Sequence, residues 1–262
     1  MKVAFMTFAC PTFTLDEVLA AAKKYGYDGV EPRIDANHNH GIEADASAAW
    51  RTETRRKFAE SGIVNCCLAT SLQFIGEQAV KDAPARIDLA ADLGAPGLRV
   101  FCGPIPKGQP MGMDEVVARV ADNLMKVADY AKQRKVEIWL ETHDTVRQGK
   151  PVGEILDRCK HPFILANYDV MHPFCNGEPL EVTFKALHGK VRHTHFHDAK
   201  AGGGVNIVQV GEGVVPMPQI IRFLKTEGFQ GFLSGEWFDP LGPADVTLPK
   251  FVAAMRAVVA YA

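Results

Sequence analysis

The amino-acid sequence predicts an α/β protein, a single (β/α)8 barrel that spans residues 1–262. Three observations predict this fold. Eight short apolar runs alternate with eight longer segments of helical spacing, no long structureless linker separates them, and no shift in composition marks a second domain. Such alternation predicts parallel strands joined by right-handed crossovers. Eight strand–helix units in 262 residues fit a closed barrel better than an open, doubly wound sheet.

The expected strands are short runs of β-branched or apolar residues at 2–9, 27–34, 63–70, 97–103, 136–143, 163–170, 191–198 and 231–237. Each precedes a segment of helical spacing, and helices are expected at 15–26, 48–62, 83–94, 113–135, 151–160, 179–189, 217–228 and 249–262. The first helix shows its limits clearly. Apolar residues recur at i, i+3, i+4 and i+7 from Leu15, acidic residues lie in its first turn, and Gly26 follows its last turn.

Two nucleotide-binding motifs are missing. The first strand is followed by "TFACPTFT" rather than GxGxxG, which argues against a Rossmann fold. The stretch 202–213, "GGGVNIVQVGEG", precedes no Lys-Ser/Thr pair, so we interpret it as a flexible loop after the seventh strand rather than as a phosphate loop.

Composition and charge give no support to a nucleic-acid or membrane partner. The formal charge is −2, and the longest basic run is 55–57. No signal peptide and no run of 18 apolar residues is visible, so we expect a soluble, cytoplasmic protein. Six scattered cysteines without a CxxC pair predict buried free thiols. The sequence leaves open a homo-oligomer.

Metal-competent side chains end four consecutive predicted strands: Glu141 the fifth, Asp169 the sixth, His195 the seventh and Glu236 the eighth. The chemistry of a (β/α)8 barrel lies at the C-terminal ends of its strands, so these side chains are expected to meet at the barrel mouth. Three carboxylates placed together repel one another unless a divalent cation lies between them. The set predicts one divalent ion, Mn²⁺ or Mg²⁺, with Co²⁺ or Zn²⁺ as alternatives. Taken by itself, each of these carboxylates could instead cap a helix or form a salt bridge in a loop.

Further histidines are expected around this centre. His172 follows Asp169 by three residues and is predicted to contact the substrate, with a further metal ligand or a surface loop residue as alternatives. His193, His195 and His197 share one strand face, but they cannot all bind one ion, because alternate residues lie about 6.6 Å apart along a strand. We therefore expect His193 deeper in the barrel, in a hydrogen bond, and His197 at the rim beside the substrate.

Two more side chains are placed at the mouth. Glu31 ends the second strand and is expected to contact the substrate or to support the ligands; a buried salt bridge with Arg33 or Arg99 is the alternative. His143, two residues after Glu141, is a further expected substrate contact.

Other polar and aromatic residues have weaker interpretations. His38 and His40 are interpreted as residues of a solvated loop rather than as a metal pair, and Asp198 is predicted to orient a neighbouring imidazole or to bind Lys200. Four aromatic residues near strand ends are expected mostly to pack between barrel and helices, with one or two lining the pocket: Phe8, Phe101, Trp139 and Trp237.

At these residues the chain resembles the xylose isomerase-like TIM-barrel superfamily, whose members include sugar isomerases and epimerases, inosose dehydratase and endonuclease IV. The matching stretches are "YGYDGVEPRI", "IWLETH", "NYDVMHPF", "VRHTHFHDAK" and "VGEGVVPMPQIIRFLKTEGFQGFLSGEW", which together extend over nearly the whole chain. The resemblance implies a TIM barrel with one divalent ion held by Glu141, Asp169, His195 and Glu236, and it implies that His172 contacts the substrate.

The chain also departs from two groups of that superfamily. Members with three zinc ions need extra histidines after the third and fourth strands and an Asp-x-His after the seventh, where this chain has "CCLATS", "FCG" and "GGGVNIVQV". We therefore expect neither a trinuclear site nor phosphodiester cleavage. The ketose 3-epimerases usually carry an arginine six residues after the ligand histidine, where this chain has Ala201.

These residues predict proton abstraction next to a carbonyl on a small carbohydrate or polyol-derived substrate. The ion would stabilise an enediolate as a Lewis acid, while Glu141 and Glu236 remove and return the proton, which gives a sugar isomerase or epimerase. A dehydratase of a substrate such as an inosose, with His172 or His197 as the acid, is the alternative. A sugar-binding barrel without catalysis is a third hypothesis, but a pure binder has no need of two carboxylates flanking a carbonyl.

Overall fold

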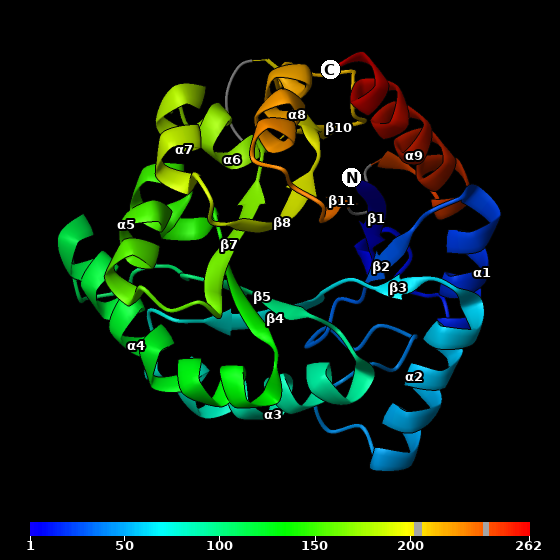
Figure 1. The fold of residues 1–262 in the computed structure, drawn as a ribbon, viewed down its shortest axis with the longest axis horizontal. Helices are drawn as coiled ribbons and strands as arrows, with labels where there is room; N and C mark the ends of the chain where they lie inside the picture. Colours follow the sequence, from blue (N-terminus) through cyan, green and yellow to red (C-terminus); the bar gives the residue numbers. More distant parts are fainter. Residues whose placement is uncertain (202–205, 238–240) are drawn as a thin grey trace.

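The computed structural model describes residues 1–201, 206–237 and 241–262, and Figure 1 shows strands at the centre with helices around them. In chain order the strands of the main sheet are β1 (Lys2–Met6), β2 (Gly29–Glu31), β3 (Val64–Asn65), β4 (Leu68–Gln73), β5 (Gly97–Phe101), β6 (Glu137–Glu141), β7 (Ile164–Asp169), β8 (Val191–Phe196) and β11 (Phe232–Gly235). They lie in the order β3-β2-β1-β11-β8-β7-β6-β5-β4, and each neighbouring pair is parallel. The predicted α/β barrel is confirmed.

The third predicted strand, 63–70, is divided in two. β3 pairs with β2, β4 pairs with β5, and Cys66 and Cys67 lie between β3 and β4. Beyond the end of β2, an isolated parallel bridge joins Arg33 to Ala69. This bridge brings the two ends of the sheet together, so the barrel is nearly closed and Arg33 lies at its seam.

Helices follow the strands at the predicted places and form the outer layer (Figure 1). They are α1 (Leu15–Tyr25), α2 (Ala48–Ser61), α3 (Glu77–Leu93), α4 (Met113–Arg134), α5 (Gly149–Cys159), α6 (Met171–Cys175), α7 (Leu180–Leu187), α8 (Met217–Thr226) and α9 (Ala244–Tyr261), with short 3-10 helices η1 (Thr7–Ala9) and η2 (Asp144–Val146). The predicted starts of the third and the last long helix, at 83 and 249, are wrong, because each prediction placed a proline in the first turn. Pro84 and Pro249 lie inside α3 and α9, where a proline removes a backbone hydrogen bond without ending these helices.

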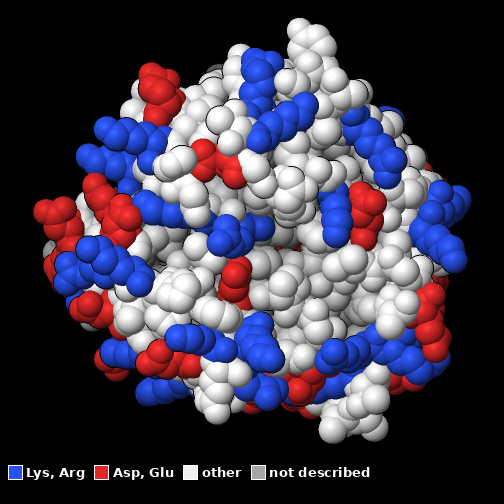
Figure 2. Space-filling model, viewed as in Figure 1, with Lys and Arg blue, Asp and Glu red and all other residues white. Residues whose placement is uncertain are grey.

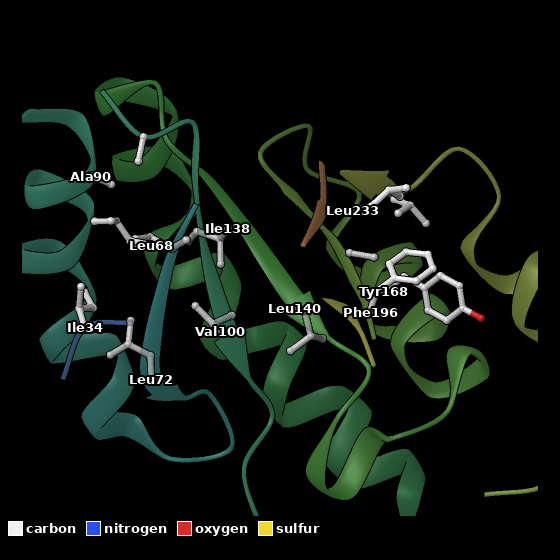
Figure 3. Packing of buried hydrophobic residues seen from close by; sticks show 14 of the residues in the cluster. Ile34, Leu68, Leu72, Ala90, Val100, Ile138, Leu140, Tyr168, Phe196 and Leu233 are labelled. Carbon is white, nitrogen blue, oxygen red and sulfur yellow. The ribbon is translucent and has the colours of Figure 1, made fainter. Parts of the chain in front are cut away.

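Strand side chains alternate between the helices and the barrel interior. In β6, Ile138 and Leu140 belong to the main hydrophobic cluster, which Figure 3 shows between strands and helices, whereas Trp139 belongs to a second, smaller cluster. That smaller cluster also contains Ala4, Cys66, Cys67, Leu165 and Phe232. Because side chains alternate with a period of two, Trp139 shares its face with Glu141, and the smaller cluster fills the barrel interior beneath the carboxylate. All six cysteines are free and five are buried, in agreement with the prediction of free thiols.

Charges are interspersed on the molecular surface that Figure 2 shows. Lys and Arg side chains alternate with Asp and Glu side chains around its edge, and much of its centre carries neither. Among the helices of the described residues, none has both the length and the apolar character that a membrane span requires.

The loop after β2 differs from its prediction. His40 is only 2% exposed; its Nδ1 accepts a hydrogen bond from Ile42 N at 3.0 Å, and its Nε2 lies 3.1 Å from Thr7 Oγ1. The interpretation of His40 as a solvated residue is therefore wrong, because both ring nitrogens bind the protein. His38 is half-buried beside it, with the two ring centres 5.5 Å apart.

We expect the buried, neutral His40 to make the protein sensitive to acid. Burial lowers the pKa of His40 to about 3, so the folded protein binds its proton less readily than the unfolded chain does. The contribution of His40 to stability is complete above pH 6.5 and falls as the pH drops toward 3. Between pH 7 and pH 5, wild type should lose about 2 kcal/mol relative to His40→Asn, which cannot titrate. Urea unfolding of both proteins at several pH values measures this difference, and a difference that stays constant with pH would contradict it.

Candidate metal centre and active site

The four predicted metal ligands lie together at the C-terminal ends of adjacent strands. Glu141 and Asp169 are the last residues of β6 and β7, His195 lies near the end of β8, and Glu236 directly follows β11. One ligand atom of each lies within 4.8 Å of those of the other three, and all four residues are buried. His195 Nδ1 is 2.7 Å from Glu141 Oε1 and 3.0 Å from Glu236 Oε2. Parallel pairing of the strands thus gathers residues that are far apart in the sequence.

These residues fit a divalent cation. Glu141 Oε2 is buried without a hydrogen-bond partner and lies 3.4 Å from Arg99 Nε, so no donor N–H or O–H group of the described residues holds this carboxylate oxygen. Three carboxylates and one imidazole form a donor set that Mn²⁺, Mg²⁺ and Zn²⁺ accept. The cluster could therefore hold such an ion.

Electrostatics keeps this cluster ionised. Burial alone would lower the pKa of His195, but the carboxylates of Glu31, Glu141 and Glu236 outweigh burial and raise that pKa well above its ordinary value. Burial would raise the pKa of Glu236, but His195 and Arg99 lower it to about 2. The carboxylate and the imidazole hold each other in their charged forms, as a neighbouring opposite charge does.

A fully buried arginine lies behind Glu141. Arg99 of β5 is 0% exposed, and its Nε lies 3.4 Å from Glu141 Oε2. Its Nη1 donates to Thr70 O at 3.0 Å, and its guanidinium carbon lies 4.0 Å from the ring centre of Phe101. Sequence reasoning named Arg99 only as a possible partner of Glu31. The available signal was a charged residue inside the apolar run of β5, "GLRVF", because a buried strand seldom carries an unpaired charge.

Glu31 lies behind His195. Its Oε1 is 3.0 Å from His195 Nε2, while its Oε2 is 2.7 Å from His193 Nε2 and accepts a 2.7 Å hydrogen bond from Ser234 Oγ. Its closest partners are therefore two imidazoles and a hydroxyl. Among the described residues no arginine forms an ion pair with Glu31, so the alternative of a salt bridge to an arginine is wrong. Glu31 is fully buried and contacts the candidate metal centre through His195.

Three further histidines lie beside Asp169. His197 Nε2 is 2.7 Å from Asp169 Oδ2, and His172 Nε2 is 3.8 Å from the same oxygen. The ring of His143 lies 4.4 Å from that of His172, centre to centre, and its Nδ1 is 2.7 Å from Asp144 Oδ1. Burial would lower the pKa of His143, but Asp144 and Glu141 raise it to about 9. The structure thus brings all three predicted substrate-contacting histidines to the candidate metal centre.

The carboxylate of Asp198 has different hydrogen-bond partners from the predicted ones. Its carboxylate accepts hydrogen bonds from the backbone N–H groups of Ala199, Gly211, Gly213 and Val215 at 2.9 to 3.0 Å. A Cβ on Gly213 would lie 2.2 Å from Asp198 Oδ1, which explains a glycine there. The prediction that Asp198 orients an imidazole or binds Lys200 is wrong, because the loop backbone takes both carboxylate oxygens. Gly202–Gly204 of the predicted flexible loop lie outside the described residues.

The aromatic residues near the strand ends divide between packing and the site. Trp237 packs against Phe251 of α9, with ring centres 4.9 Å apart. Trp139 stacks on His193 inside the barrel, with ring centres 5.3 Å apart. Phe101 contacts His143 at the mouth, with ring centres 4.9 Å apart, so it borders the site directly.

A family model described as "Xylose isomerase-like TIM barrel" matches residues 19–256. The chain belongs to this family. The match includes all four candidate ligands and the helices between them, so the resemblance inferred from the sequence motifs is confirmed at the level of the family.

Known relatives of this xylose isomerase-like barrel include enzymes of two classes. A fructoselysine 3-epimerase of Shigella flexneri is 20% identical over 250 residues, which cover 90% of each chain. A 3-dehydroshikimate dehydratase of Bacillus anthracis is 22% identical over 261 residues, which cover 91% of each chain. Among solved structures, the IolI protein with a bound zinc atom superposes with a TM-score of 0.86 at 21% identity, covering 100% of this chain and 99% of the other. At this identity the superposition shows the fold.

In this xylose isomerase-like barrel, we expect Glu31 to position His195 for metal binding. A carboxylate that accepts the second N–H of a ligating imidazole fixes the tautomer and the ring orientation. Glu31→Gln should therefore weaken Mn²⁺ binding about 10- to 100-fold, as measured by isothermal titration calorimetry. Glu178→Gln is a control, because Glu178 is also buried but binds the backbone at Gly149. Equal Mn²⁺ affinity in wild type and Glu31→Gln would contradict this role.

Proposed function

We propose that this chain is a divalent-metal-dependent sugar isomerase or epimerase that moves a proton next to a carbonyl. The proposal depends on one observation: Glu141, Asp169, His195 and Glu236 place one ligand atom each within 4.8 Å of one another. Glu141 and Glu236 come from strands that β7 and β8 separate in the sheet. Two carboxylates can therefore approach a central substrate from different directions.

The residues present supply the steps of such a reaction. A divalent ion held by the four ligands supplies Lewis-acid polarisation of the substrate carbonyl. One of the two glutamates removes the proton from the neighbouring carbon, and the other returns it. Return to the opposite face of that carbon inverts it, whereas return to the adjacent carbon interconverts an aldose and a ketose. We propose that His172 and His197, both more than nine-tenths buried beside Asp169, bind substrate hydroxyls.

A dehydratase is the second candidate, and His197 favours it. Burial would lower the pKa of His197, but the carboxylate of Asp169 outweighs burial and raises it, so this imidazole holds its proton more readily than an ordinary histidine does. An acid in this position could protonate a hydroxyl group that leaves from the carbon beyond the enediolate. The two curated relatives show the same division between an epimerase and a dehydratase.

Deuterium exchange tests the proposal. The protein is incubated in D2O with Mn²⁺ and a panel of ketoses, inososes and hydroxypyruvate, the ion is removed by chelation, and the products are analysed by NMR. We expect deuterium at a carbon next to the carbonyl. Loss of water with formation of a double bond would instead identify a dehydratase, and no exchange on any member of the panel would argue for a sugar-binding protein.

A further inference from the structure

One buried charge at the barrel seam has no counter-ion. Arg33 is 8% exposed, and no carboxylate of the described residues forms an ion pair with it. Its Nη1 donates to Ile34 O and to Ala69 O, its Nη2 donates to Ser71 Oγ, and its Nε is buried without an acceptor. By contrast, the other buried arginine, Arg99, lies against a carboxylate of the candidate metal centre.

The carboxylates nearest to Arg33 have other partners. Asp35 Oδ1 lies 2.7 Å from Arg86 Nη2. Glu43 accepts hydrogen bonds from the backbone N–H groups of residues 35–37, and Glu236 is bonded to His195. Burial and then the charge of Arg99 lower the pKa of Arg33 to about 10, so its guanidinium is still charged at neutral pH. An isolated buried charge is costly unless a ligand or another group compensates it.

The location of Arg33 suggests such a ligand. Arg33 lies two residues beyond the end of β2, in a parallel bridge with Ala69, so it follows Glu31 on the side of the barrel where the strands end. Its backbone N donates to Thr7 Oγ1 at 2.8 Å, and its guanidinium carbon lies 5.4 Å from the ring centre of Phe8. The charges of Arg33 and Glu236 influence each other. The segment after β2 thus carries a cation, whereas the segments after β6 and β7 and the end of β8 carry imidazoles.

We propose that Arg33 binds a carboxylate of the substrate, and that the chain acts on a sugar-derived acid in preference to a neutral sugar. This inference depends on the proposed function, because it assumes a substrate seated at the metal centre. A planar guanidinium matches a carboxylate in geometry and charge. A neutral hydroxymethyl group in its place would leave the buried charge uncompensated, which is the condition under which a binding site discriminates strongly. We favour a carboxylate over a phosphate because Arg33 is a single cation with most of its donors already used.

Matched pairs of ligands test this inference. D-Fructuronate carries a carboxylate at carbon 6, where D-fructose carries a hydroxymethyl group. Hydroxypyruvate and dihydroxyacetone differ in the same way, but their carboxylate or hydroxymethyl group is bonded directly to the keto carbon. Binding of each is measured by calorimetry to Mn²⁺-loaded wild type and Arg33→Met. We expect wild type to bind the acid of at least one pair about tenfold or more tightly than its neutral partner. Arg33→Met should lose that preference and keep its affinity for the neutral ligand within about twofold.

Control variants separate binding from structural support. Arg51→Met removes a partly buried cation whose partner Asp92 keeps a second ion pair with Arg134, so it should leave the preference for the acid unchanged. Arg33→Lys keeps the charge and should recover part of the preference if Arg33→Met unfolds, which thermal melting detects. If Arg33 has only a structural role, Arg33→Met should weaken the binding of both ligands of a pair equally. That result would overturn the inference, and so would the absence of any preference for the acid in wild type. An Arg33-dependent preference for dihydroxyacetone phosphate over hydroxypyruvate would overturn the choice of a carboxylate.

The same samples distinguish this inference from the proposed function. Deuterium exchange on the bound ligands is measured after the calorimetry. Arg33-dependent binding of an acid without exchange would reject the isomerase and retain the carboxylate site. Exchange that is equally efficient on acids and neutral sugars would retain the isomerase and reject the carboxylate site.

Discussion

Glu236→Gln is expected to lower deuterium exchange at least about 1000-fold at saturating Mn²⁺, while the protein remains folded. The amide has nearly the shape of the carboxylate, but it cannot accept the substrate proton, and general base catalysis of this kind contributes about 100- to 10,000-fold. The amide is also a poorer metal ligand, so the Mn²⁺ concentration must be raised until the rate no longer increases. The rate is measured by NMR in D2O on whichever substrate wild type exchanges.

Glu178→Gln is the control for this variant as well. Glu178 is 6% exposed, close to the 8% of Glu236, but its carboxylate binds Gly149 N and Lys150 N at the start of α5 and Thr183 Oγ1 of α7. Its loss should reduce the melting temperature and leave exchange within a few-fold of wild type. Exchange at a wild-type rate in Glu236→Gln would contradict the assignment of this glutamate as base or ligand.

Arg99→Met is expected to destabilise the protein by about 3–5 kcal/mol, because it leaves buried carboxylates without their permanent cation. Burial would lower the pKa of Arg99, but Glu141, Glu236 and Glu31 outweigh burial and raise it. The raised pKa reflects the same attraction between the guanidinium and these carboxylates. The carboxylate cluster becomes more negative in the variant, so Mn²⁺ should bind more tightly and raise the melting temperature more than in wild type. Urea unfolding without the ion and thermal melting with it measure the two effects.

Arg134, a partly exposed arginine with two ion pairs, is the control for Arg99. Arg134 forms ion pairs with Asp88 and Asp92 at 2.8 and 3.1 Å, but its side chain is 35% exposed. Exposed pairs contribute about 0–1 kcal/mol, so Arg134→Met should change stability little and leave the response to Mn²⁺ unaltered. A loss of stability in Arg99→Met no larger than in Arg134→Met would show that the buried guanidinium is not needed to balance the carboxylates.

The fold and the candidate ligands could be predicted because each depends on a local pattern. The two-residue and helical periods of the apolar residues locate strands and helices, and the acidic or imidazole residue at the end of a strand then follows from its position. The four candidate ligands could be found in this way, because a barrel of parallel strands brings the C-terminal ends of neighbouring strands together. They are Glu141, Asp169, His195 and Glu236. The division of the third strand at Cys66 and Cys67 could not, because these residues continue the apolar pattern without a break.

Pairings between distant residues were harder to predict. The sequence indicates that Glu31 points into the barrel, but it does not indicate whether His193 or an arginine meets it there, because that depends on how far each strand is shifted relative to its neighbours. His40 was misinterpreted for a related reason: its loop is polar in composition, yet Thr7 and Ile42 N satisfy its ring nitrogens and allow it to be buried. Asp198 gave no signal of its own, because a carboxylate that binds backbone N–H groups needs no particular partner side chains.

The carboxylate of Asp198 holds the segment after β8 at both of its ends. It binds Ala199 on one side and Gly211, Gly213 and Val215 on the other, and Lys200 N donates to Asn206 O at 3.0 Å. Residues introduced between Lys200 and Asn206 would therefore exert little force on His195 and His197, which precede this anchor. The barrel can accept insertions at this point and acquire new contacts to a substrate while its reacting groups keep their places, so that substrate choice and chemistry can evolve separately.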